Sequence, residues 1–147
     1  MEKWQMITIS DLKAFRQKEK SIKRLEERLS ELNESCGKIQ AVRYDSESRG
    51  NGQHLPEDNW INDIVLKREI EAQLRVVRCE VYHVRQTLEA LEPEERIVLE
   101  GFFMNRTAGY IDKLISELNL ERSSVYRLKD RALEHYVLIA YGVTSYH

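Results

Sequence analysis

The sequence predicts an all-α protein. The 147 residues include only two Pro and six Gly, a composition that favours long helices over a turn-rich β fold. Charged residues make up 33% of the chain and hydrophobic residues 41%, as expected for helices with large solvent-exposed surfaces. Apolar residues recur at three- and four-residue spacing over most of the sequence. We therefore expect a long helical hairpin or coiled coil over residues 1–91 and a second helical domain over residues 92–147.

The N-terminal segment predicts one amphipathic helix. Residues 1–9 are expected to be a short tail, and Thr8 or Ser10 to cap a helix over residues 11–32. The apolar stripe of that helix is narrow and has dense charge on both sides, which is typical of a coiled coil or helical hairpin. The stripe consists of Phe15, Ile22, Leu25, Leu29 and Leu32. Residues 33–55 contain Gly, Ser and Asn and few large apolar residues, so they predict a flexible loop.

A second helix is expected over residues 57–91, directly after Pro56. Its apolar residues alternate spacings of four and three for three heptads, the pattern of a coiled-coil seam. The seam consists of Ile70, Leu74, Val77, Val81, Val84, Leu88 and Leu91. This helix would be about 50 Å long and needs a partner along its length. We expect the first helix to cover part of it, and another copy of the chain to cover the rest with the help of Trp60, a dimer being favoured.

The C-terminal segment predicts a compact set of short helices. Pro93 is expected to end the long helix and start the next, and Gly101 to permit close helix approach. Two amphipathic segments then meet at Asn119, a residue that tolerates the left-handed conformation ending a helix. The second segment is expected to end at Gly142. This spacing is that of a helix-turn-helix, whose second helix enters the DNA major groove.

The outer face of the second segment is basic. From Arg122 to Arg131 there are four basic residues against one acid, a local net charge of +3. The residues predicted to contact double-stranded DNA are Arg122, Ser123, Ser124, Tyr126, Arg127, Lys129 and Arg131. The first five are expected to face base edges, and the last two to hold phosphates. A solvated charged helix face is the alternative, because seven Lys and Arg stand against eight Asp and Glu from Pro93 onward.

Two runs of residues carry a resemblance to a known family. The runs 118–133 and 91–99 resemble region four of bacterial sigma factors, and more closely the phage-encoded transcriptional regulators of the ArpU and RinA type. The resemblance implies a sigma-region-four-like helix-turn-helix domain at residues 92–147. It also implies a transcription regulator that binds specific DNA sequences, expected to activate late genes of a phage or prophage. RNA polymerase is a further expected partner, and the cytoplasm of a bacterial host the expected location.

Two other functions stay open. A small terminase-like DNA-packaging protein also joins a helix-turn-helix to oligomerising helices, and a ring of eight or more copies would favour it. A polymerase- or sigma-binding interaction module would keep the same helices without binding DNA.

Motifs of enzyme and metal chemistry do not occur in the sequence. Cys36 and Cys79 are isolated and no His lies at ligand spacing from either, so we expect no metal site and a reducing compartment. The four His residues are scattered, and there is no phosphate-binding loop or nucleophile motif. We therefore expect no enzymatic activity, no cofactor and no membrane span.

Overall fold

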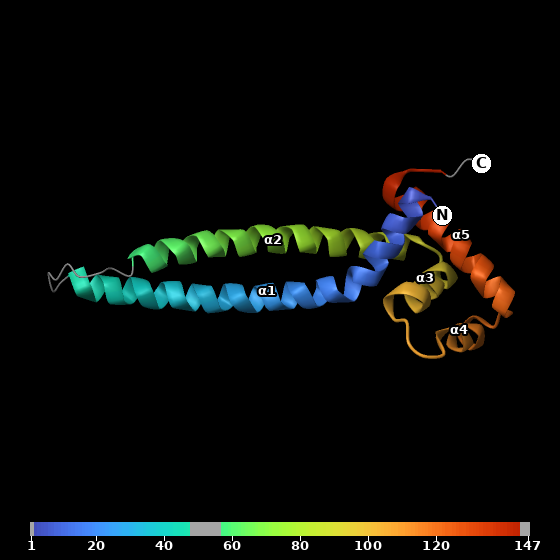
Figure 1. The fold of residues 1–147 in the computed structure, drawn as a ribbon, viewed down its shortest axis with the longest axis horizontal. Coiled ribbons are helices and arrows are strands. Elements are labelled where there is room, and N and C mark those ends of the chain that lie inside the picture. Colours follow the sequence, from blue (N-terminus) through green and yellow to red (C-terminus); the bar gives the residue numbers. More distant parts are fainter. Residues whose placement is uncertain (1, 48–56, 145–147) are drawn as a thin grey trace. The chain divides into compact units, whose positions relative to one another are not determined.

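A computed structural model (Figure 1) describes the backbone of residues 2–47 and 57–144, and the side chains of residues 2–35 and 61–144. Every regular element in these ranges is helical, so the all-α prediction is confirmed. The elements are α1 (Lys3–Glu47), α2 (Glu57–Ala90), α3 (Pro93–Leu99), the π-helical turn η1 (Glu100–Met104), α4 (Tyr110–Leu118) and α5 (Arg122–Tyr141). The chain divides into two compact units. Unit 1 is Met1–Glu19 with Cys79–His147, and unit 2 is Lys20–Arg78.

The helix α1 is longer at both ends than the sequence predicts, so the predicted tail and part of the predicted loop are wrong. Residues 3–9 form its first turns, and Thr8 does not cap a helix: its buried hydroxyl donates to the Trp4 carbonyl at 2.9 Å. Residues 33–47 continue the helix. Gly37 does not end it, because a Gly within a helix costs only about 1 kcal/mol relative to Ala. The rest of the predicted loop, residues 48–55, lies outside the described residues.

The limits of the two units differ from the predicted boundary at residue 91. The first turns of α1 and the last turns of α2 belong to the same unit as α3, α4 and α5. Phe15 and four residues of the predicted seam are buried in that unit. The four seam residues are Val81, Val84, Leu88 and Leu91. The domain predicted at residues 92–147 therefore also draws on residues from both long helices.

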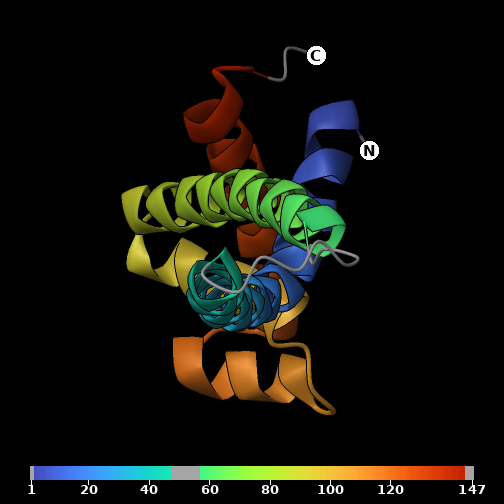
Figure 2. The ribbon, with the colours of Figure 1, turned by 90° about the vertical axis from the view of Figure 1, so that its left-hand side faces the viewer.

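In unit 2 the remaining parts of α1 and α2 lie side by side (Figures 1 and 2). Its buried core is formed by Leu25, Ile70 and Leu74. Four half-buried residues pack against that core, namely Ile22, Leu29, Leu32 and Leu66. This part of the predicted seam is thus covered by α1 of the same chain, and only Val77 stays half-buried. The seam therefore gives no support to the predicted contact with another copy, and the side chain of Trp60 lies outside the described residues.

Unit 1 has a core built from the short helices. α3 packs on α5, and Pro93 occupies the first turn of α3, as predicted. A Cβ atom at Gly101 would come within 2.7 Å of Leu114 Cδ2, which confirms the predicted close approach. α4 ends at Asn119 with φ 55°, and α5 ends at Gly142 with φ 68°, both in the predicted left-handed conformation. Figures 1 and 2 also show the first turns of α1 beside the last turns of α5.

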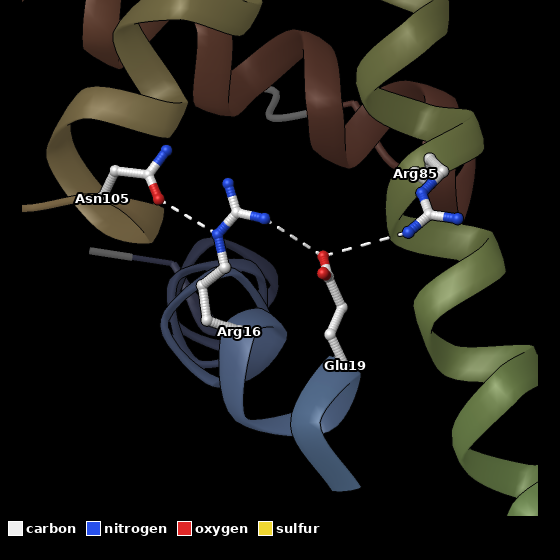
Figure 3. A network of polar contacts seen from close by, with 4 residues as sticks. All are labelled: Arg16, Glu19, Arg85 and Asn105. Atoms are coloured by element: carbon white, nitrogen blue, oxygen red, sulfur yellow. Dashed lines mark hydrogen bonds and ion pairs between the residues drawn. The ribbon is translucent and has the colours of Figure 1, made fainter. Parts of the chain in front are cut away.

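Polar side chains join α1, α2 and η1 within unit 1 (Figure 3). Arg16 Nε donates to Asn105 Oδ1 at 3.0 Å, and Asn105 is the residue at which η1 ends. The Arg16 guanidinium also pairs with Glu19 at 3.2 Å, and Arg85 approaches the same carboxylate at 3.9 Å. These exposed contacts each contribute at most about 1 kcal/mol. Together they hold the end of η1, from which the chain turns into α4.

Candidate nucleic-acid interface

The connection between α4 and α5 is three residues long, from Asn119 to Glu121. Asn119 reverses the chain with left-handed backbone angles, and Glu121 then starts α5 in an extended conformation, without a side-chain cap. A connection this short forces the second helix to leave the first at a sharp angle. The Glu121 carboxylate lies at the positive end of the α5 dipole, where a negative charge is favourable.

One side of α5 is buried and fixes which side faces solvent. Buried residues recur along α5 at three- and four-residue spacing. They are Val125, Leu128, Ala132, Leu133, Tyr136 and Val137. Val125 and Ala132 have no exposed surface at all, so the helix cannot rotate about its axis without exposing core. The residues opposite this side are therefore presented to solvent in a fixed direction.

Five of the seven predicted DNA-contacting residues lie on or beside that solvent side. Arg122, Ser123, Arg127 and Arg131 are exposed, and Ser124 is half-buried. Ser124, Arg127 and Arg131 line one surface depression, together with Leu120, Leu128 and Glu94. Among the described residues, none of the three arginines has an ion-pair partner. Their guanidinium groups are therefore available to an anionic ligand.

Of the other two predicted residues, Tyr126 is exposed but its ring also contacts η1, whereas Lys129 packs against the same turn. The Tyr126 ring meets the Phe102 ring edge-on, with centroids 5.5 Å apart. Lys129 Nζ lies 5.6 Å from the Phe102 centroid and 3.0 Å from Asp130 Oδ1, and only 20% of the Lys129 side chain is exposed. The prediction that Lys129 lies on the outer face is thus wrong: at about 100° per residue it falls near the buried side of the helix.

Three charged residues outside α5 were not among the predicted site residues: Glu94 of α3, Arg106 of the turn before α4, and Lys113 of α4. Glu94 of α3 adds a carboxylate to the depression that holds Arg127 and Arg131. Arg106 stacks on Tyr110, with the guanidinium 4.5 Å from the ring centroid, and donates to the Tyr110 hydroxyl at 2.9 Å. Lys113 follows in the first turn of α4.

A buried carboxylate lies between α3 and α5. Glu95 is only 3% exposed, and its Oε2 lies 2.6 Å from His135 Nδ1. The contact is an ion pair when His135 is protonated. Its direction does not suit a hydrogen bond, and Oε2 has no hydrogen-bond partner in the described part of the chain. The first turn of α3 stabilises the carboxylate through the helix dipole.

No protein-family model, curated protein or solved structure matches the chain. Within residues 2–47 and 57–144, no helix is both long and apolar enough to cross a membrane. In the same residues, no three potential metal ligands among His, Cys, Asp and Glu come together. The candidate interface on α5 is therefore supported by its geometry alone, a fixed helix that presents arginine and serine side chains to solvent.

Proposed function

We propose that the chain is a transcription regulator that binds double-stranded DNA sequence-specifically, with α4 and α5 as a helix-turn-helix of the sigma-region-four kind. One observation carries the proposal: α5 presents Arg122, Arg127 and Arg131 to solvent, without ion-pair partners in the described residues. Guanidinium groups make bidentate contacts with guanine in the major groove and with phosphates. A helix locked in rotation by Val125 and Ala132 gives such contacts a fixed register.

In this proposal the N-terminal half of α5 lies in the major groove. Arg122, Ser123 and Ser124 face base edges near the start of the helix, and Arg127 contacts a base one turn later. Tyr126 lies at the flank, and Arg131 reaches a phosphate on the far side of the groove. The positive N-terminal end of α4 adds a second phosphate contact. Glu94 and Glu121 lower the affinity, so binding is weak and sensitive to salt.

The likeness of residues 118–133 to sigma region four supports the biological setting of the proposal. It favours a phage or prophage regulator that activates late genes and contacts RNA polymerase. The hairpin of α1 and α2 would serve as the assembly region, so that two copies bind two half-sites. The net charge of −2 for the whole chain fits a protein that needs a second copy or a protein partner for stable DNA binding.

Selection of bound sites from random duplex DNA tests the proposal directly. Arg127→Ala should weaken binding to the selected site and relax preference at one base pair, by about 1–3 kcal/mol of discrimination. Arg131→Ala should weaken all sequences alike and lower the salt slope by about one. Arg24→Ala, at an exposed arginine of unit 2, is the matched control and should bind as the wild type does. Folded Arg127→Ala protein that binds like the wild type excludes α5 as the reading helix.

Lys129→Ala separates the two possible roles of that residue. If Lys129 holds phosphate, as expected from the sequence, the substitution weakens binding to all sequences alike. If Lys129 instead packs on the Phe102 and Tyr126 rings, the substitution lowers stability and leaves the salt slope unchanged.

One observation favours a second function, the interaction module without DNA binding. Glu94 shares its depression with Arg127 and Arg131, so a partner carrying both charges would suit this surface. Failure of any duplex to be enriched, with binding to a sigma factor or polymerase retained, would establish that function. The packaging alternative predicts a ring of eight or more copies, which solution mass detects.

A further inference from the structure

A depression lies within unit 1 where α1, α2 and α5 meet, and we call it the three-helix depression. Its volume is about 470 Å³, within the range of sites that hold small organic molecules. Asp11 and Lys18 line it from α1, Glu80 from α2, and Tyr136 and Tyr141 from α5, together with small and apolar residues. Tyr136 is only 2% exposed, so the depression reaches down to the core of the unit.

One charge of the three-helix depression has no opposite charge beside it. Lys18 Nζ lies 2.9 Å from Glu80 Oε2, so these two residues form an ion pair. Asp11 has no ion-pair partner among the described residues. No base stands three or four residues from Asp11 along α1, and Lys18 follows only after a rise of about 10 Å. With His83 counted as neutral, the lining carries a formal net charge of −1, from two acids and one base.

The Asp11 carboxylate is held in position by a neighbour that does not neutralise it. The Tyr141 hydroxyl donates to Asp11 Oδ2 at 3.0 Å, and Oδ1 accepts no hydrogen bond from the described residues. Burial, and then the hydrogen bond to Asp11, raise the pKa of Tyr141 from 10.0 to about 12. Tyr141 therefore keeps its proton at neutral pH and remains a donor. The fixed carboxylate has one oxygen left for a ligand that donates hydrogen bonds.

The end of α5 adds negative potential at the same place. Ala140 and Tyr141 line the three-helix depression from the last turn of α5, and this turn contains no basic residue. The C-terminal end of a helix carries a partial negative charge, which favours a nearby cation. Aromatic rings such as that of Tyr141 attract cations as well. The unpaired carboxylate and the helix end therefore both favour a positively charged ligand.

We propose that the three-helix depression binds a small organic ammonium group, with the Asp11 carboxylate as its counter-ion. Val84 and Ala140 also line the depression, and they suit the hydrocarbon part of such a ligand. A bare Ca²⁺ or Mg²⁺ ion would instead need about six oxygen ligands around it. The inference goes beyond the proposed function and does not rest on it, because the depression lies at the C-terminal end of α5, past the predicted DNA-contacting residues 122–131.

Titration of the full chain with n-butylammonium at about pH 7.5, followed by the backbone amide chemical shifts, tests the proposal. The wild type should bind with a dissociation constant on the order of 1 mM, with the largest shifts near Asp11 and Tyr141. 1-Butanol has the same chain length without the charge and should bind at least about tenfold more weakly. The proposal is overturned by a wild type without saturable shifts up to about 50 mM, or by equal affinity for the two probes.

A matched pair of variants tests the counter-ion. Asp11→Asn keeps an oxygen that accepts from Tyr141, but it should raise the dissociation constant for n-butylammonium at least about tenfold. Glu134→Gln, at an exposed acid of α5 outside the depression, should bind as the wild type does. Folded Asp11→Asn protein that binds like the wild type overturns the proposal.

Lys18→Gln carries the test if Asp11→Asn does not fold. It removes the lysine that lines the three-helix depression and leaves Glu80 without its ion pair, so the dissociation constant for n-butylammonium should fall about threefold. This variant should stay folded, because it loses only a partly exposed ion pair. An affinity that does not rise in Lys18→Gln then overturns the proposal, and DNA binding is judged separately by site selection.

Discussion

Unit 1 buries apolar side chains in several directions, whereas unit 2 buries them along a single line. In unit 1, residues from α1, α2, α3, α4 and α5 all reach the core, and Val98, Leu99 and Val125 have no exposed surface. In unit 2, the buried residues among those described are Leu25, Ile70 and Leu74, and their apolar neighbours are half-buried. A core enclosed from several sides fixes every helix in it, while a single line of contacts leaves the far side of each helix open.

This difference matches the roles that we propose for the two units. A DNA-reading helix needs a fixed direction, because an error of one position along the helix turns the side chains away from the bases. α5 has that support, since its buried side extends from Val125 to Val137. In the hairpin, by contrast, the outer side of α2 stays open, because Ile61, Val65 and Val76 are exposed there.

Core truncation in the two units should break or confirm the comparison, and it has the largest expected effect. Leu99→Ala should lower the free energy of unfolding of unit 1 by about 2–5 kcal/mol, because the fully enclosed site cannot collapse around the cavity. The loss of unfolding free energy for Leu74→Ala should lie at or below the bottom of that range, since the half-buried neighbours of Leu74 can move into the cavity. Urea unfolding with hydrogen exchange resolves the loss in each unit. Equal losses would show that unit 2 is as tightly enclosed as unit 1.

Removal of the partner of the buried Glu95 should have the next largest effect. His135→Ala removes the one charged neighbour of that buried carboxylate among the described residues and should cost unit 1 about 1–3 kcal/mol. His135→Gln keeps a polar side chain at this position and should cost less, which makes it the matched control. A double variant with Glu95→Gln should recover much of the loss. If His135→Ala unfolds like the wild type, the contact contributes nothing and the dipole of α3 alone holds the charge.

The element ends marked by special residues could be predicted from the sequence, and those without such a mark could not. Pro93, Asn119 and Gly142 each restrict or permit a particular backbone conformation, and each lies where the prediction put it. The ends of α1 have no such residue. Few large apolar residues follow Leu32, so the periodicity fades there although the helix continues. Absence of an apolar pattern indicates exposure and does not by itself indicate a loop.

The candidate interface was predictable along one helix but not between helices. Five of the seven residues could be assigned to the solvent side of α5, because the inward positions of Val125 and Leu128 set its rotation. Lys129 was misplaced because charge was taken as a sign of exposure, whereas a lysine stem can cover aromatic rings. Glu94 reaches the same depression from α3, a contact that no spacing in the sequence reveals.

Tyr141 offers a pH-dependent test of the enclosure of unit 1, with a smaller effect because its side chain is partly exposed. Its hydroxyl donates to Asp11 at 3.0 Å, and its ring centroid lies 5.0 Å from that of Trp4. Burial, and then the hydrogen bond to Asp11, raise the pKa of Tyr141 from 10.0 to about 12. The folded protein therefore holds this proton between pH 10 and 12 while the unfolded chain loses it, so the stabilisation is complete below pH 10 and falls as pH rises to 12.

Tyr141→Phe should reduce the loss of stability between pH 9 and pH 11.5, measured by urea unfolding at each pH. Some loss of stability with rising pH should remain in this variant, because burial also raises the pKa of Tyr136. Tyr82→Phe, at an exposed tyrosine of α2, is the control and should keep the full loss. A Tyr141→Phe protein with an unchanged pH dependence would show that α1 and α5 do not shield this hydroxyl in solution.

The smallest expected effect concerns the ion pair of unit 2. Arg78 Nη2 lies 2.6 Å from Glu26 Oε1, with both side chains about half exposed. An exposed pair of this kind contributes about 0.2–1 kcal/mol, and salt screens it at about 1 M. A double-mutant cycle with Glu26→Ala and Arg78→Ala should therefore give a coupling energy within that range at low salt and near zero at high salt. A larger, salt-resistant coupling would mean that water is excluded around the pair, and that unit 2 is enclosed on more than its one apolar line.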